Sequence, residues 1–199
     1  MSAEDDHSRS HVYVWDLPLR IAHWSLAASI VVAWLSAIVL DSLHRWAGYV
    51  AIALVAFRIV WGFVGSDSAR LNRLTFLLPN AIRFLRRLMR GRTGGYVGLN
   101  PAGALMLVAS LSLTLISGIS GWMQITVRFF GIEWVQMLHT WSSCVLLVLA
   151  GVHILGVVAV SIMQRQNLVL AMFTGRKRKK ISRTRVSVRR GAQSSFYDT

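Results

Sequence analysis

The sequence predicts an all-α protein, a four-helix transmembrane bundle, and three observations support that prediction. Of the 199 residues, 54% are apolar and only 15% are charged, whereas soluble domains carry roughly 25% charged residues. Four apolar segments each approach or exceed the roughly 20 residues that a helix needs to cross a bilayer. The basic residues are also distributed so unevenly that they predict an orientation for these segments.

The four apolar segments are the predicted membrane spans, at about residues 19–40, 46–64, 101–123 and 140–163. We expect helices because backbone polar groups in lipid must be satisfied within the segment. The first two spans are nearly continuous, and Asp41 with Ser42 marks a tight hairpin between them, since both are good N-cap residues. The chain therefore divides into a polar leader (1–18), a membrane domain (19–163) and a basic tail (164–199).

The positions of the charges explain the high net charge of +14. A strongly basic chain can indicate nucleic-acid binding. Here, however, seven arginines lie between spans two and three, ten basic residues follow span four, Arg9 precedes span one and Arg20 lies at its start. Only Arg45 and Arg128 lie on the opposite side. The positive-inside rule thus predicts that both termini and the middle loop are cytoplasmic, and we expect no nucleic-acid partner.

A cytoplasmic interfacial amphipathic helix is predicted between spans two and three, over residues 77–89. One face carries the apolar side chains and the other carries arginines, a composition typical of a helix that lies on anionic lipid. The residues of the two faces are Ile82, Leu85, Leu88 and Met89, and Arg83, Arg86, Arg87 and Arg90. The polybasic run at 176–180 is interpreted as a further membrane anchor.

Four histidines at membrane positions carry the predicted chemistry, because ionisable residues in spans are costly and usually functional. His139 and His153 are 14 residues apart, which is about 40° short of four helical turns and roughly 21 Å along the axis. Both therefore project from nearly one face, at opposite ends of the span. The same spacing relates His44 to Arg58. The sequence thus predicts an outer layer with His44 and His139 and an inner layer with His23, His153 and Arg58.

Two opposed histidines can hold haem iron from both sides through neutral imidazole nitrogens. Cys144 is the single cysteine, so any haem is expected to be bound without a covalent link. Arg58 is predicted to pair with a haem propionate, and Gly48, near His44, leaves room for a porphyrin, as Gly118 and Gly121 would in span three. Two alternatives remain open: a haem-free membrane scaffold, and a transition-metal transporter, which would ordinarily use carboxylate or Cys ligands.

Several motifs then point to a known family. They occur in order, over nearly the whole chain to about residue 177: 14–18 (VWDLP), His23-Trp24, 44–49 (HRWAGY), 57–65 (FRIVWGFVG), 100–104 (NPAGA), His139, 149–153 (LAGVH) and 167–177. With them the chain resembles the bacterial cytochrome b561 and nickel-iron hydrogenase b-type cytochrome family. The resemblance implies a four-helix protein of the bacterial inner membrane with two b-type haems, one ligated by His23 and His153 and the other by His44 and His139.

The resemblance also implies a function, namely electron transfer between the quinone pool and a periplasmic redox partner such as a soluble c-type cytochrome or a hydrogenase-like enzyme. The relatives include a superoxide oxidase that reduces ubiquinone, and this activity is the alternative. Trp15, Asp16 and Arg20, beside His23, are the candidate quinone neighbourhood. The sequence leaves open the direction of electron flow, whether the chain is itself an enzyme, and whether it forms a homodimer.

One departure from the family pattern concerns the outer layer. The family often has Glu after the ligand that corresponds to His139, whereas this chain has Thr140. The loop at 124–138 also looks short. Because oxidised haem carries an extra positive charge, the loss of a nearby anion is predicted to raise the potential of the outer haem.

Overall fold

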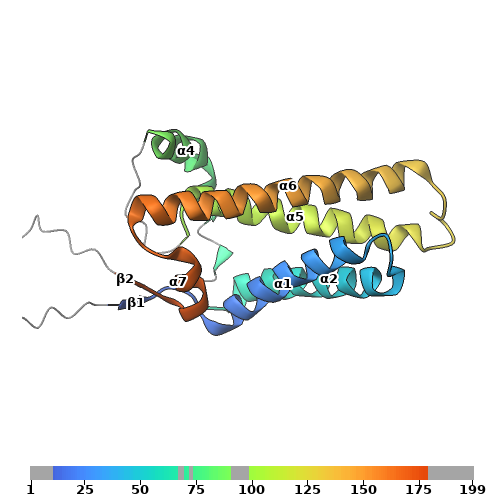
Figure 1. The fold of residues 1–199 in the computed structure, drawn as a ribbon, viewed down its shortest axis with the longest axis horizontal. Coiled ribbons are helices and arrows are strands. Elements are labelled where there is room, and N and C mark those ends of the chain that lie inside the picture. Colours follow the sequence, from blue (N-terminus) through green and yellow to red (C-terminus); the bar gives the residue numbers. More distant parts are fainter. Residues whose placement is uncertain (1–10, 67–69, 72–73, 91–98, 179–199) are drawn as a thin grey trace, which may run out of the picture.

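Four long helices form the body of the protein. The computed structural model describes residues 11–66, 70–71, 74–90 and 99–178. Helices α1 (Leu17–Ser36), α2 (Asp41–Val64), α5 (Pro101–Gln124) and α6 (Glu133–Gln164) run alongside one another (Figure 1). Each is long and apolar enough to cross a membrane, which confirms the predicted four-helix transmembrane fold. The start of the leader, Arg73, Arg92 and the tail after residue 178 lie outside the described residues.

The helix bounds differ from the predicted spans at both external turns. α1 ends at Ser36, before the apolar run ends, and α2 begins at Asp41. α6 begins at Glu133, well before the predicted residue 140, and is 32 residues long. The reason is that Val135 is completely buried, so this first part of α6 is held by packing although it is too polar to resemble a membrane span.

An aspartate and an asparagine side chain begin two of the long helices. The Asp16 Oδ1 accepts a hydrogen bond from the Leu19 backbone N–H at 3.1 Å at the start of α1. Asn100 does the same for Gly103 at 2.7 Å at the start of α5. Such side chains satisfy backbone donors that have no partner in the first turn of a helix. Pro18 and Pro101 follow these caps, in the first turn, where a missing N–H costs nothing.

The bundle consists of two helical hairpins joined along one seam. α1 packs on α2, α5 packs on α6, and α2 contacts α5, whereas α1 and α6 do not pack closely on each other among the described residues. Gly118 permits the close approach of α5 to α2, because a Cβ there would lie 2.5 Å from Ile52 Cγ1. Gly118 is therefore needed for helix packing, and its role in making room for a porphyrin stays a prediction.

A short antiparallel pair of strands joins the two ends of the described chain. β1 (His11–Tyr13) pairs with β2 (Arg176–Arg178), and the Val14 N–H donates to the Gly175 carbonyl at 2.8 Å. Helix α7 (Leu168–Thr174) precedes β2 and ends at Gly175, whose φ of 74° suits glycine. The sequence predicts no strands here, because three-residue strands are too short to show an alternating pattern.

The segment between the two hairpins carries the predicted amphipathic helix. It contains α3 (Leu74–Leu77), a 3₁₀ turn (Leu78–Asn80) and α4 (Ala81–Met89), and α4 packs against α5. Figure 1 shows α4 beside the end of the bundle at which β1, β2 and α7 lie. The strands β1 and β2 and the middle segment are therefore at the same end of the helices, which is named the inner end below.

Asp16 also ties α1 to the end of α2 at the inner end. Its Oδ2 accepts hydrogen bonds from Trp61 Nε1 at 3.0 Å and from Ser66 Oγ at 2.5 Å. Arg58, which is buried with 8% of its surface exposed, interacts electrostatically with the same carboxylate. The Asp16 carboxylate therefore caps α1, accepts hydrogen bonds from the C-terminal end of α2, and places a negative charge near the buried guanidinium of Arg58.

We expect Asp16→Ala to destabilise the protein by about 2–4 kcal/mol, because it removes a helix cap and leaves two donors on α2 and its C-terminal end without their acceptor. The measurement is thermal unfolding in detergent followed by circular dichroism. The matched control is Asp41→Ala, which removes an exposed ion pair to Arg45 and the acidic residue in the first turn of α2, and should cost about 1 kcal/mol or less. Equal melting temperatures for the two variants would contradict this role of Asp16.

Candidate functional site

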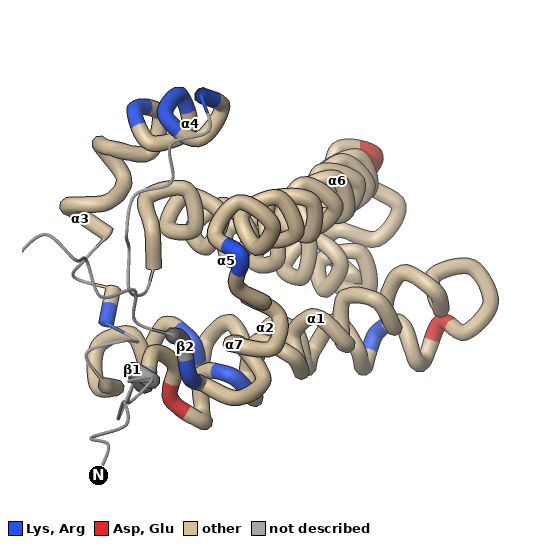
Figure 2. Tube along the Cα trace, turned by 60° about the vertical axis from the view of Figure 1, so that its left-hand side comes forward, with Lys and Arg blue, Asp and Glu red and all other residues tan. Residues whose placement is uncertain are grey.

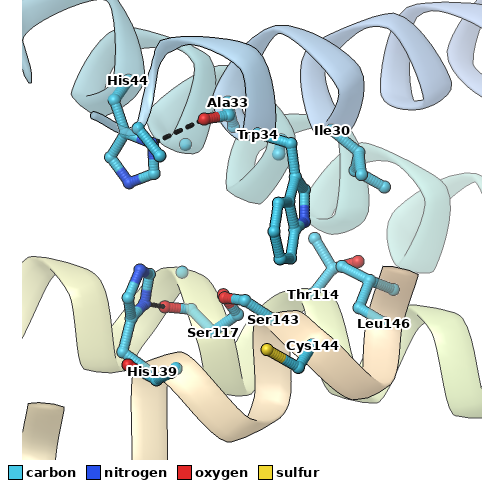
Figure 3. A pocket seen from close by; sticks show the side chains of 15 residues that line it. Ile30, Ala33, Trp34, His44, Thr114, Ser117, His139, Ser143, Cys144 and Leu146 are labelled. Carbon is cyan, nitrogen blue, oxygen red and sulfur yellow. Dashed lines mark hydrogen bonds between the residues drawn. The ribbon is translucent and has the colours of Figure 1, made fainter. Parts of the chain in front are cut away.

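The outer pair of histidines comes together across the two hairpins. His44 lies in the first turn of α2 and His139 in the second turn of α6, and their ring centroids are 6.0 Å apart with an interplanar angle of 86°. The two rings lie on opposite walls of one cavity, and in each ring one nitrogen points toward the other ring (Figure 3). The predicted members of the outer layer are therefore neighbours in the structure.

Backbone carbonyls hold both outer rings. His44 Nδ1 lies 2.8 Å from the carbonyl oxygen of Ala33, and His139 Nδ1 lies 2.8 Å from that of Ser117. A carbonyl oxygen only accepts hydrogen bonds, so in both rings Nδ1 carries the proton. The lone pair is consequently on Nε2, the nitrogen available to a metal ion, and such outer hydrogen bonds are the usual support of a ligating histidine.

The acceptor of His44 is available because α1 ends where it does. Ala33 lies in the last turn of α1, and the last four carbonyls of a helix have no helical partner. His44 satisfies one of them from the next helix. The tight turn at 37–40 thus places the His44 imidazole, which belongs to α2, against the C-terminal end of α1.

Ser117 also links α5 directly to α6. Its hydroxyl lies 2.6 Å from that of Ser143, one turn beyond His139 on α6. Gly121 adjoins the His139 ring, since a Cβ there would lie 2.9 Å from His139 Cε1. Gly121 therefore accommodates the ring of His139, and the predicted approach of a porphyrin to this position stays a prediction.

The cavity between the outer rings has a volume of about 160 Å³. Gly48 lines it, and a Cβ at Gly48 would meet nothing within 4 Å, as expected for a position that keeps space open beside His44. The wall also contains apolar, hydroxyl and thiol side chains, several of which are labelled in Figure 3: Ile30, Trp34, Thr114, Ser117, Ser143, Cys144 and Leu146.

The inner pair comes together in the same way but with different support. His23 of α1 and His153 of α6 have ring centroids 6.2 Å apart at 61°. Trp24 meets His23 edge-on at 5.5 Å and stacks on Phe173 of α7 at 4.2 Å. Within the described part of the chain, neither inner ring has a hydrogen bond to a backbone carbonyl of the kind that supports the outer rings.

Two buried nitrogens near His23 have no hydrogen-bond partner among the described residues. They are Arg20 Nε and Trp24 Nε1, from residues one helical turn apart on α1. A buried donor without an acceptor costs roughly 1–3 kcal/mol. An oxygen-bearing ligand that accepts from these nitrogens would recover that cost.

The other predicted inner residues have structural partners. The Asp16 carboxylate is engaged by Leu19, Trp61 and Ser66, and the Trp15 backbone N–H donates to the Gly175 carbonyl at 3.3 Å. The Arg58 guanidinium lies beside Gly62, where a Cβ would be 3.2 Å from Nη1. Of the three residues predicted for a quinone neighbourhood, Arg20 is the one with an unpartnered buried donor.

The geometry of both pairs fits a shared metal ion. A metal ion lies about 2 Å from an imidazole nitrogen, and the ring centroid is about 1 Å further away, so two opposed ligands of one ion have centroids roughly 6 Å apart. Both observed separations, 6.0 and 6.2 Å, match this spacing. Two neutral imidazoles with no carboxylate beside them suit haem iron, and within the described residues no cluster of three or more His, Cys, Asp or Glu side chains is found.

Gly48, Gly121 and Arg58 were expected near the histidines from the sequence, whereas the backbone acceptors and the hydroxyl side chains of the cavity were not. The acceptors Ala33 and Ser117 contribute backbone oxygens, which no residue type reveals. Thr114, Ser117 and Gly121 recur at intervals of three and four residues on α5, and this helical spacing of small residues was the available signal. Trp24 was named only as part of a motif.

Comparisons with known proteins agree on one family. The family model described as prokaryotic cytochrome b561 matches residues 14–175. A curated protein of Bradyrhizobium diazoefficiens, named as a probable Ni/Fe-hydrogenase B-type cytochrome subunit, is 28% identical over 230 aligned positions, which cover 88% of this chain and 90% of the relative. No solved structure gives a significant match.

Proposed function

Because this chain belongs to the prokaryotic cytochrome b561 family, and is thus a multi-pass membrane b-type cytochrome of electron transfer, we propose that it holds two haems and connects the quinone pool to a periplasmic redox partner. Two opposed histidine pairs at two levels of the bundle are the observation that carries the proposal. His139 and His153 belong to one helix, roughly 21 Å apart along its axis. The two pairs therefore lie near opposite faces of the membrane.

In this proposal each residue of the two layers has a distinct role. His44 and His139 hold the outer haem, and His23 and His153 hold the inner haem, each through Nε2. Gly48 keeps space beside the outer ring, and Arg58 is the cation for an inner propionate. A b-type haem held in this way supplies one-electron redox chemistry. The chain's own contribution is to fix both rings of each pair in position and to exclude water.

Arg20 and Trp24 mark the proposed contact with quinone. Their buried nitrogens have no hydrogen-bond partner among the described residues and lie next to the inner ligand His23, so a quinone carbonyl is a suitable acceptor. The basic character of this end, with α4 and β2, supports a cytoplasmic location in the inner membrane by the positive-inside rule. The periplasmic partner would then approach the outer end, at the α1–α2 and α5–α6 turns.

The test of this function uses the purified protein in detergent or nanodiscs. We expect a low-spin b-type spectrum with two haems per chain, reduction by a short-chain quinol, and reoxidation by a soluble c-type cytochrome. A colourless preparation overturns the proposal. If superoxide reduces the two haems and quinol does not, the result assigns the superoxide oxidase activity instead. Superoxide dismutase is the control, because it should abolish reduction by superoxide.

Thr140, which also lines the outer cavity, provides a test of the outer potential. We expect Thr140→Glu to lower the midpoint potential of the outer haem by roughly 50–100 mV, because a carboxylate near the iron favours the oxidised form. The measurement is a redox titration of the visible spectrum. The neutral variant Thr140→Gln should stay close to the native value, and an unchanged or higher potential for Thr140→Glu would contradict the expectation.

A further inference from the structure

The rotation of α4 is fixed by its contact with α5. Ala81 and Phe84 are buried, with 2% and 7% of their surfaces exposed, and α4 packs against α5. These two residues therefore mark the side of α4 that faces the bundle. The remaining apolar residues of α4 could, on sequence grounds, have been part of the same contact.

The structure instead leaves an apolar strip without a protein neighbour. Ile82, Leu85 and Met89 are exposed by 68%, 41% and 86%, and at 100° per residue they lie within about 60° of one another around the helix. The four arginines follow on the next sector of the surface, and all are exposed: Arg83, Arg86, Arg87 and Arg90. The surface of α4 thus has three successive sides: one that contacts the bundle, one that carries the apolar strip, and one that carries the arginines.

The place of α4 relative to the bundle matches this order. It lies on the outside of the α5–α6 hairpin at the inner end of the helices (Figure 1). Figure 2 shows basic positions gathered along α4 with no acidic position among them, and the described residues between 70 and 90 include no Asp or Glu. The helix that carries the apolar strip therefore lies at the level where the long apolar helices end.

We propose that α4 is a binding surface for anionic phospholipid, with Ile82, Leu85 and Met89 inserted among the acyl chains and the arginines on the headgroup phosphates. Guanidinium groups bind phosphate in a bidentate manner. A soluble acidic partner would satisfy the arginines, but it would not account for an apolar strip at the level where the long apolar helices end. A lipid leaflet provides both an apolar layer and a phosphate layer at the required relative positions.

The first experiment measures lipid preference with the full chain in nanodiscs of phosphatidylcholine, alone or mixed with phosphatidylglycerol. We expect phosphatidylglycerol to raise the melting temperature and to be retained in native mass spectrometry. The triple variant Arg83→Gln, Arg86→Gln, Arg87→Gln should lose this retention by about fivefold per arginine. The matched control is Arg45→Gln, an exposed arginine at the outer end, which should behave as the native chain.

The second experiment identifies what contacts the apolar strip. Met89→p-benzoylphenylalanine is illuminated in native membranes, and the adduct is identified by mass spectrometry. A phospholipid adduct is the expected result. A protein adduct at this position overturns the proposal. The proposal is also overturned if the triple variant retains phosphatidylglycerol as well as the native chain does. The haem spectrum of each variant shows independently whether the bundle and the proposed function are intact.

Discussion

Replacing His23 or His153 by alanine is expected to remove one and the same haem, and replacing His44 or His139 to remove the other. Each histidine of a pair supplies one of two opposed nitrogens, and the ring centroids are 6.2 Å apart in the inner pair and 6.0 Å apart in the outer pair. Either substitution in a pair therefore removes half of one ligand set. We expect each variant to retain about one haem per chain. These are the largest effects anticipated for any single substitution.

The measurement combines haem quantification with a redox titration of the haem that remains. His23→Ala and His153→Ala should leave a single component with the same midpoint potential, and the two outer variants should leave the other component. His7→Ala, outside the membrane domain, is the histidine control and should keep both. If His23→Ala and His44→Ala left the same component, the proposed pairing would be wrong.

A second large effect is expected at Gly121, although this residue carries no side chain. A Cβ at this position would lie 2.9 Å from Cε1 and 3.0 Å from Nδ1 of His139. The ring would have to move, and its hydrogen bond to the Ser117 carbonyl, now 2.8 Å, would be strained. Because supporting contacts of this kind change affinity by about 10–100-fold, Gly121→Ala should weaken outer haem binding by at least about tenfold, and Gly121→Val should abolish it.

The control for Gly121 is Gly151→Ala on α6, where an added Cβ meets nothing within 4 Å. Both changes favour helix formation by roughly 1 kcal/mol, so a difference between them reports on the His139 ring. Haem titration of the apoprotein and the electron paramagnetic resonance g values of the outer haem are the measurements. Native g values and native haem content in Gly121→Ala would show that the ring tolerates the added methyl group.

Residue spacing was sufficient to predict the four spans and the two histidine layers. The interval of 14 residues between His139 and His153 depends only on helix geometry, and the structure brings each predicted pair together. The family resemblance is confirmed by the match over residues 14–175. Hydropathy, residue spacing and ligand chemistry thus predicted the architecture, and the ordered motifs were needed to identify the family.

Features that depend on tertiary contact were not predictable in the same way. The acceptors of His44 and His139 are backbone oxygens, and α6 extends to Glu133 because Val135 is buried, a property of the bundle and not of the local sequence. Asp16 was assigned to a quinone neighbourhood on its position alone. The structure shows that its carboxylate connects α1 to Trp61 and Ser66, contacts between residues 45 and 50 positions apart.

The seam between the two hairpins has a consequence for how the protein is assembled. Each histidine pair takes one ring from the α1–α2 hairpin and one from α6, while the hairpins contact each other mainly through α2 and α5. Cofactor capture and hairpin docking are then thermodynamically linked, since a ligand that binds only the docked state stabilises it. Under this linkage, haem supply in the cell would set the yield of the folded protein, and apoprotein made under haem starvation would be the form cleared by membrane proteases.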